Sequence, residues 1–375
     1  MPPELPDRTA LVHDWLTGMR GGEKCLEVLC DMFPSAPIHT LVAFPDQLSA
    51  TINRHSIRTS FLQRMPMVET RYRHYLPLFP TAIERFNMDK YELIVSSSHA
   101  VAKGIRPAEG ALHISYVHTP MRYVWDMFDQ YFNVNTIGSA RLAFIRLVAA
   151  QIRKWDVKTS VRVHHFIANS AYVAERINRI YGRDAEVIHP PVETSRFATA
   201  YNNDGRFLIV SALVPYKRVD LAVETANALQ LPLRIIGDGP ERLRLLSLAG
   251  PTVTIEGWLS DPEIENAYAA CRALLFPGEE DFGIVPVEAM ACGKPVIAFG
   301  RGGARETVVE GLSGTLFPEQ TVSSMSAAIQ RFERMEFDAD SIRTHAEAFD
   351  RSVYHTRMLE YITERWRIWD RSPSR

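Results

Sequence analysis

Two glutamates, Glu280 and Glu288, have the clearest potential for chemistry in this sequence. They flank Gly283, which lies where an acidic loop (277–283) passes into a predicted helix (284–292). The backbone N–H groups at the start of a helix form an anion site. Carboxylates beside such a site are poor phosphate ligands but good acceptors for sugar and ribose hydroxyls. Alternatively, the loop is a solvated segment whose charges interact favourably with the helix dipole.

The elements around these glutamates are those of a parallel α/β sheet. Apolar runs at 273–276 and 295–299 are long enough for buried strands, and the helix lies between them. Gly293 follows the helix, where a left-handed C-cap is expected. In such sheets ligands bind at the carboxyl ends of the strands, which is where the acidic loop lies.

A pair of cations, Lys217 and Arg218, follows another predicted strand (207–213) and precedes an amphipathic helix that extends to Leu229. Cations at the start of a helix oppose its dipole. This unfavourable placement favours a ligand explanation, and a diphosphate is the ligand that the two charges would neutralise. The alternative is an ordinary surface helix.

The N-terminal half opens with a predicted strand (9–14) and a glycine-rich turn that includes Gly21 and Gly22. Such a turn lets the backbone approach a phosphate, although many only close a tight loop. It does not match G-x-G-x-x-G, which disfavours a dinucleotide oxidoreductase. A later strand (113–118) ends in His118, at the edge where sites form. A lone histidine there is more often structural.

The composition narrows the class of protein. A chain of 375 residues suits two domains, and 46% hydrophobic residues suit ordinary globular cores. A net charge of −2 argues against a general nucleic-acid binder. The cysteines show no C-x-x-C pair or zinc spacing, which favours a reducing cytoplasm. We expect no signal peptide and no membrane span.

A basic stretch (54–85) combines six arginines with interleaved aromatic and aliphatic residues. This composition suits a membrane surface or a lipid-linked polyphosphate acceptor. The alternative is a core-packed helix with a solvated arginine face. A long, basic, amphipathic helix is also predicted over 141–162.

The segment 280–284 (Glu-Asp-Phe-Gly-Ile) followed by Glu288 resembles the Glu-x7-Glu motif of retaining glycosyltransferases of family 4, and the resemblance extends over most of the chain. It implies the α/β GT-B fold, with two Rossmann-like, doubly wound domains facing across a cleft. The N-terminal acceptor domain would comprise 1–198 together with a crossing helix (353–375). The C-terminal nucleotide-sugar donor domain would comprise 199–352.

The resemblance also implies roles for individual residues. Glu280 would lie beside the donor sugar, Glu288 would bind the ribose, and His118 would lie near the C6 hydroxyl of the sugar. The residues expected in catalysis are Glu280, His118 and Lys217. Those expected to bind the nucleotide sugar are Gly21, Gly22, Lys217, Arg218, Gly257, Trp258, Leu259, Gly283, Ile284, Val285 and Glu288.

Acceptor binding and one departure from the family concern three further positions. Arg122 is expected to bind an acceptor phosphate and Asp126 an acceptor hydroxyl. Family members usually carry Gly-Arg-Leu where this chain has Ser-Ala-Leu, so that arginine is absent at Ala212. We expect Arg218 to supply the second charge. No Asp-x-Asp lies where a metal–diphosphate site would be, so neither a metal ion nor a cofactor is implied.

The reaction implied is sugar transfer with retention, by same-face attack with the leaving phosphate as base. Segments 118–123 and 213–217 resemble mannosyltransferases of polysaccharide and O-antigen assembly. This implies GDP-mannose as donor, a polyprenyl-diphosphate-linked saccharide as acceptor, no nucleic-acid partner, and peripheral contact with the inner membrane leaflet through the basic stretch. A UDP-sugar-dependent transferase, a GT-B nucleotide-sugar epimerase and a non-catalytic nucleotide-sugar-binding partner remain open.

Overall fold

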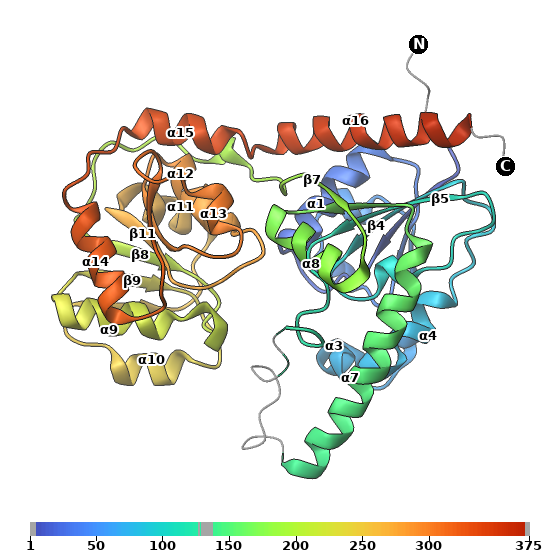
Figure 1. The fold of residues 1–375 in the computed structure, drawn as a ribbon, viewed down its shortest axis with the longest axis horizontal. Coiled ribbons are helices and arrows are strands. Elements are labelled where there is room, and N and C mark those ends of the chain that lie inside the picture. The colour runs from blue at the N-terminus through green and yellow to red at the C-terminus, as the bar shows by residue number, and fades with distance from the viewer. Residues whose placement is uncertain (1–4, 127, 129–137, 372–375) are drawn as a thin grey trace. The chain divides into compact units, whose positions relative to one another are not determined.

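The structure is a computed structural model that describes residues 5–126, 128 and 138–371. The chain forms two compact units, Met1–His189 with Tyr354–Arg375, and Pro190–Val353 (Figure 1). Each contains one parallel sheet.

The boundary between the units lies closer to the N-terminus than the predicted one at 198/199. The backbone N–H of Val192 donates to the Phe349 carbonyl at 3.0 Å. The Thr194 hydroxyl donates to Asp350 Oδ2 at 2.6 Å. These bonds hold the segment after His189 on the second unit.

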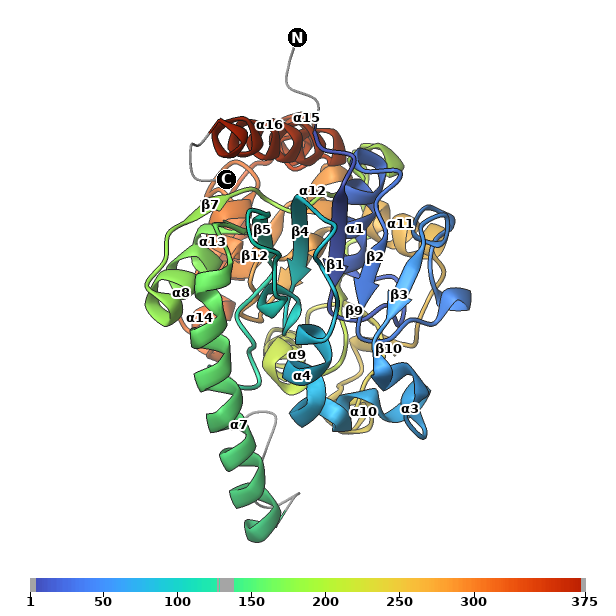
Figure 2. The same ribbon diagram turned by 90° about the vertical axis from the view of Figure 1, so that its right-hand side faces the viewer.

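The first unit is built on seven parallel strands in the order β3-β2-β1-β4-β5-β6-β7. Figure 2 shows β3, β2, β1, β4 and β5 side by side. The order reverses between β1 and β4, as in doubly wound sheets. The strands are β1 (Thr9–His13), β2 (Ile38–Thr40), β3 (Ile57–Thr59), β4 (Leu93–Ser98), β5 (Leu112–Val117), β6 (His165–Ala168) and β7 (Ala185–Val187).

Helices cover both faces of this sheet. The α-helices described are α1 (Gly21–Met32), α2 (Ala50–Asn53), α3 (Val68–Arg71), α4 (Phe79–Glu84), α7 (Ser139–Thr159), α8 (Ala171–Tyr181) and α16 (Arg351–Asp370). Short 3-10 helices occupy Pro45–Gln47, Phe61–Arg64, Tyr72–Leu78, Ala102–Gly104, Ser160–Arg162 and Thr194–Arg196, the last in the second unit.

Side-chain alternation along β1 explains why two layers are needed. Leu11 packs in a core cluster with α1 and with Tyr354 and Met358 of α16. Ala10 and Val12 point into a different cluster that includes α4. Successive residues of a strand face opposite sides of a sheet, so an apolar strand requires cover on both.

The basic stretch (54–85) is not the single helix considered above. It divides into β3, the short helices α3 and α4, and two 3-10 helices. Aromatic residues such as Tyr72 and Phe79 are buried in the core, while all six arginines are exposed. Within the described part of the chain, no helix has the length and apolar character needed to span a bilayer.

The second unit contains six parallel strands in the order β10-β9-β8-β11-β12-β13, the 3-2-1-4-5-6 order of Rossmann sheets. The strands are β8 (Phe207–Val210), β9 (Leu233–Ile236), β10 (Val253–Glu256), β11 (Ala273–Phe276), β12 (Val296–Phe299) and β13 (Gly314–Phe317). The helices are α9 (Val219–Leu229), α10 (Arg242–Leu248), α11 (Asp261–Ala270), α12 (Ile284–Ala291), α13 (Ala304–Thr307), α14 (Val322–Phe332) and α15 (Ala339–Glu347), with a 3-10 turn at Pro215–Lys217.

Both faces of this sheet are again apolar. Leu274 lies in the cluster that contains α12 and α15, whereas Leu275 lies in the cluster with α9 and α14. The helix predicted over 284–292 is α12, and Gly293 beyond it has a φ of 72°, the left-handed conformation that was predicted.

Candidate active site

Two of the predicted residues of the second unit, Lys217 and Glu280, lie beyond the carboxyl ends of β8 and β11, which are hydrogen-bonded neighbours. Lys217 follows β8, and Glu280 lies in the loop after β11. Lys217 Nζ forms an ion pair with Glu280 Oε1, and the two side chains are only 16% and 18% exposed. The structure thus brings together two residues that are 63 positions apart in the sequence (280 − 217).

Two glycines let backbone segments meet around this pair. A Cβ at Gly278 would lie 3.0 Å from Lys217 Cα, and a Cβ at Gly302 would lie 2.2 Å from the Glu280 carbonyl oxygen. The next residue, Gly303, donates its N–H to that oxygen at 2.8 Å. A side chain at either glycine would therefore push the Glu280 loop away from Lys217 or from the turn after β12.

Glu288 lies on α12 beneath this loop, and Tyr268 Oη donates to its Oε2 at 2.8 Å. Burial raises the pKa of Glu288 above its ordinary value, although the Tyr268 hydrogen bond and the charge of Arg196 oppose the shift. The carboxylate is therefore held where its charge is unfavourable for folding.

Replacing Glu288 by glutamine is expected to stabilise the protein at pH 7. A carboxyl pKa raised by folding contributes stability below the unfolded-state pKa of about 4.3, and this contribution is lost as the pH rises through the folded-state pKa. Each tenfold difference in proton affinity between the two states corresponds to about 1.4 kcal/mol. Denaturation at pH 7 and pH 4 should show the gain only at pH 7. If Glu288 binds the ribose, KM for the donor should rise about ten- to hundredfold. A gain equal at both pH values would contradict the pKa argument.

Arg218 occupies the N-cap of α9 with a φ of 51°, and its Nε lies 3.2 Å from Asp220 Oδ1. Asp220, in the first turn of the helix, offsets the positive charge of Arg218, which is unfavourable at a helix N-terminus. Arg218 is thus held by a local ion pair, and its role as the substitute for the arginine missing at Ala212 stays a prediction.

The other residues of this unit that are predicted to bind the donor lie after β10 or at the start of α12. Gly257, Trp258 and Leu259 follow β10, and Trp258 is 66% exposed. Gly283 is the N-cap of α12, with Ile284 and Val285 as its first residues, and no described side chain caps this helix. Its first N–H groups are therefore available to an anion.

In the first unit, α1 starts at Gly21, and Gly22 lies beside two histidines. A Cβ at Gly22 would lie 3.6 Å from His118 Nε2 and 3.5 Å from His13 Cε1. Burial, then the neighbouring His99 and His13, lower the pKa of His118 well below its usual range. His118 is therefore a neutral imidazole at neutral pH.

One of the two expected acceptor residues, Asp126, has structural partners. Asp126 accepts hydrogen bonds from Arg176 Nε and Arg179 Nη2, both at 2.7 Å, which ties it to α8. Arg122 is half-buried. Both acceptor roles stay predictions.

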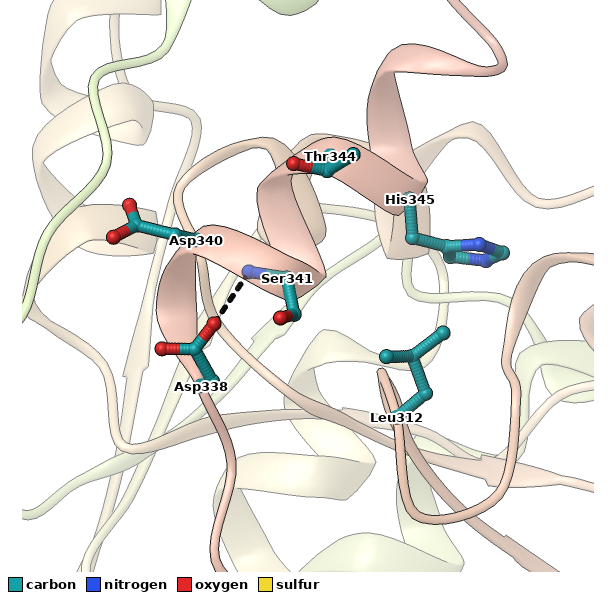
Figure 3. A pocket seen from close by; sticks show the side chains of 6 residues that line it. All are labelled: Leu312, Asp338, Asp340, Ser341, Thr344 and His345. Atoms are coloured by element: carbon teal, nitrogen blue, oxygen red, sulfur yellow. Dashed lines mark hydrogen bonds between the residues drawn. The ribbon is translucent and has the colours of Figure 1, made fainter.

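A surface hollow of about 450 Å³ lies at the start of α15, lined by the six residues of Figure 3. Asp338 accepts a hydrogen bond from the Ser341 N–H at 2.8 Å and caps the helix there. None of the predicted site residues lines this hollow.

Sequence reasoning missed several polar residues of the first unit. His13, Ser97 and His99 end or follow β1 and β4, next to the strand that ends before His118. The signal was present, because polar residues that follow neighbouring parallel strands meet at one edge of the sheet.

The sequence comparisons concern mainly the second unit. Residues 192–349 match the family model described as glycosyl transferases group 1. The GDP-mannose-dependent alpha-mannosyltransferase of Mycobacterium tuberculosis is 33% identical over 153 residues, 39% of this chain and 40% of the relative. The D-inositol 3-phosphate glycosyltransferase of Geodermatophilus obscurus is 28% identical over 218 residues, 49% and 48% of the two chains. The chain spans about half the length of the curated relatives it matches.

Similar solved structures cover both units. Anabaena HepE in complex with UDP and glucose has a TM-score of 0.68 at 18% identity, over 95% of this chain and 99% of that one. The lipopolysaccharide outer core galactosyltransferase WaaB has a TM-score of 0.68 at 17% identity, over 95% and 99%. At these identities the likeness shows the fold, and the chain has the GT-B fold. Residues 192–349 are a glycosyltransferase group 1 domain.

Proposed function

We propose that the chain is a retaining glycosyltransferase that moves mannose from GDP-mannose to a polyprenyl-diphosphate-linked saccharide in polysaccharide or O-antigen synthesis. The observation that carries the proposal is the pairing of Lys217 with Glu280 within the group 1 domain. Negative charge develops on the departing diphosphate during transfer, and a positioned cation stabilises it. Glu280, beside that cation, orients the hydroxyls of the sugar.

The remaining parts of the domain supply groups for the nucleotide. The N-terminus of α12 offers backbone N–H groups to the phosphates. Glu288 accepts hydrogen bonds from the ribose hydroxyls, and the loop 257–259, with the exposed Trp258, borders the base. These assignments explain why a half-buried carboxylate with a raised pKa lies on α12.

The proposed reaction needs no nucleophilic side chain. The bond from the sugar C1 to the phosphate oxygen breaks as the acceptor oxygen bonds to C1 on the same face. The proton of the acceptor hydroxyl passes to the departing phosphate oxygen. Lys217 stabilises the charge that remains on the diphosphate, and no divalent ion is invoked.

Two donors have specific support. GDP-mannose is favoured because two relatives from mycobacteria, 33% and 34% identical, are named GDP-mannose-dependent alpha-mannosyltransferases. A UDP-sugar is the alternative, because HepE binds UDP and glucose and its fold covers nearly the whole chain. The exposed arginines over 54–85 support a phosphate-bearing acceptor at a membrane surface.

A panel of nucleotide sugars separates these donors. With EDTA present throughout, GDP-mannose should bind with micromolar affinity in calorimetry, and GDP should be released slowly by hydrolysis. Preference for a UDP-sugar would keep the fold and mechanism and overturn the donor. Transfer that EDTA abolishes and Mg²⁺ restores would overturn metal independence, and binding of no nucleotide sugar would contradict the enzyme assignment.

A further inference from the structure

A chain of polar side chains runs through the first unit behind His118. Ser97 Oγ, at the end of β4, lies 2.8 Å from His118 Nε2 and 3.1 Å from His13 Nδ1. His13 is fully buried, and its Nε2 lies 3.8 Å from Glu23 Oε1. Among the described residues, this nitrogen has no hydrogen-bond partner.

The direction of the hydrogen bonds among these side chains is determined by Glu23. Glu23 is itself almost fully buried on α1, where its Oε2 accepts the backbone N–H of Arg20 at 3.0 Å. The nearby His13 and His99 contribute to a lowered pKa for Glu23, against the effect of burial. Glu23 is therefore a carboxylate, which attracts an N–H and repels a nitrogen lone pair. A His13 ring with one proton therefore carries that proton on Nε2, the nitrogen that faces Glu23.

The hydrogen bonds then follow in one direction. In that tautomer His13 Nδ1 is an acceptor, so the Ser97 hydroxyl donates its single proton to it. The Ser97 oxygen can therefore only accept from His118, whose Nε2 must carry a proton. Since His118 is neutral, its other ring nitrogen, Nδ1, holds a lone pair.

We propose that Glu23, His13 and Ser97 are positioning residues that fix His118 as the Nε2-protonated tautomer, so that its Nδ1 accepts a hydrogen bond from a hydroxyl of the bound sugar. The identity of the sugar ligand rests on the proposed function, whereas the tautomer does not. The hydrogen bonds between Glu23, His13, Ser97 and His118 thus select a hydrogen-bond donor as the ligand group at His118.

A neighbouring histidine follows the same logic. Asp14 accepts four backbone N–H groups from residues 99–102 at 2.6–2.9 Å, so both of its oxygens are hydrogen-bond acceptors. Its Oδ2 lies 3.2 Å from His99 Nδ1, so that nitrogen is protonated and Nε2 keeps a lone pair. The rings of His99 and His118 have centroids 6.2 Å apart. Two accepting imidazoles at this spacing suit two hydroxyls of one saccharide.

The tautomer can be read directly in the full-length protein. In long-range proton–nitrogen correlation spectra of ¹⁵N-histidine-labelled protein at pH 7, His118 should show a protonated Nε2 and an unprotonated Nδ1. The signals are assigned with a His118→Asn variant. A protonated Nδ1 on His118 in the unsubstituted protein would overturn the proposal.

Two variants test whether the hydrogen bonds from Glu23 through His13 and Ser97 determine the His118 tautomer. Ser97→Ala removes the hydroxyl, and Glu23→Gln removes the charge while keeping the shape; both should give a mixture of His118 tautomers. Ser97→Thr keeps a hydroxyl and should retain the single tautomer. Ser96→Ala is the matched control, because Ser96 makes a similar buried bond to His113 Nε2, at 2.9 Å, from the opposite face of β4. An unchanged His118 tautomer in both Ser97→Ala and Glu23→Gln would refute the positioning role of these residues.

Kinetics separate this proposal from the proposed function. Ser97→Ala should lower kcat/KM for sugar transfer about tenfold, the size of one hydrogen bond. Ser97→Thr and Ser96→Ala should stay near the unsubstituted rate. The predicted tautomer in a protein that transfers no sugar would overturn the proposed function alone. A full rate in Ser97→Ala despite mixed tautomers would overturn the role given to Nδ1.

Discussion

Replacing Lys217 by methionine is expected to lower kcat for sugar transfer by about 10²–10³. Removing one preorganised group that stabilises developing negative charge has an effect of this size. Lys217 is suited to the role because it is largely shielded from solvent and held by Glu280 and by the close approach of Gly278. Initial rates with saturating donor measure the loss, and calorimetry shows whether donor affinity changes as well.

The control for this variant is Lys90→Met, which removes an exposed lysine of the first unit and should leave the rate unchanged. Glu280→Ala should abolish transfer and leave a folded protein. An undiminished rate in Lys217→Met would contradict the assignment of the diphosphate site.

The sequence predicted best those features that depend on local pattern. The strands at 273–276 and 295–299 and the helix between them are apolar runs with glycine at both helix ends, and the structure has all three. The proximity of Lys217 and Glu280 could be predicted because the sequence places each of them after a parallel strand. A doubly wound sheet then brings such residues to one edge.

Features that depend on distant side chains were not predictable in this way. The periodicity of 54–85 does not reveal that its aromatic residues are divided among several short elements around one core. Asp126 reads as an exposed carboxylate, yet its partners Arg176 and Arg179 lie about fifty residues further along the chain. The Asp220 partner of Arg218 is only two residues away and could have been found, because an acidic residue in the first turn is a common helix signal.

The buried pair of Lys103 and Asp156 is expected to have the largest effect on stability. Lys103 Nζ lies 2.8 Å from Asp156 Oδ1, and both side chains are almost fully buried. Asp156 Oδ2 also accepts from Trp125 Nε1 at 2.9 Å and from Tyr181 Oη at 2.8 Å. Lys103→Met leaves this carboxylate without its cation, so the free energy of unfolding should fall by about 3–5 kcal/mol. Chemical denaturation followed by circular dichroism measures the change.

The predicted loss of stability in Lys103→Met is large because the ion pair is buried. Arg106→Met is the matched control, since Arg106 pairs with Glu84 at 2.6 Å but is 61% exposed, and its loss should cost at most about 1 kcal/mol. A double variant, Lys103→Met with Asp156→Asn, should recover much of the loss, because the neutral amide oxygen still accepts from Trp125 and Tyr181. Equal losses at Lys103 and Arg106 would contradict the argument.

The same pair connects stability to the histidines of the first unit. Lys103 directly follows the segment 99–102, whose backbone N–H groups hold Asp14, and Asp14 in turn holds His99. Asp156 lies on α7, so the ion pair fixes that segment against a long helix. Lys103→Met should therefore increase hydrogen exchange at the amides of 99–102 more than at β5. Exchange that rises uniformly across the sheet would show that the pair stabilises the unit without positioning the segment that orients His99.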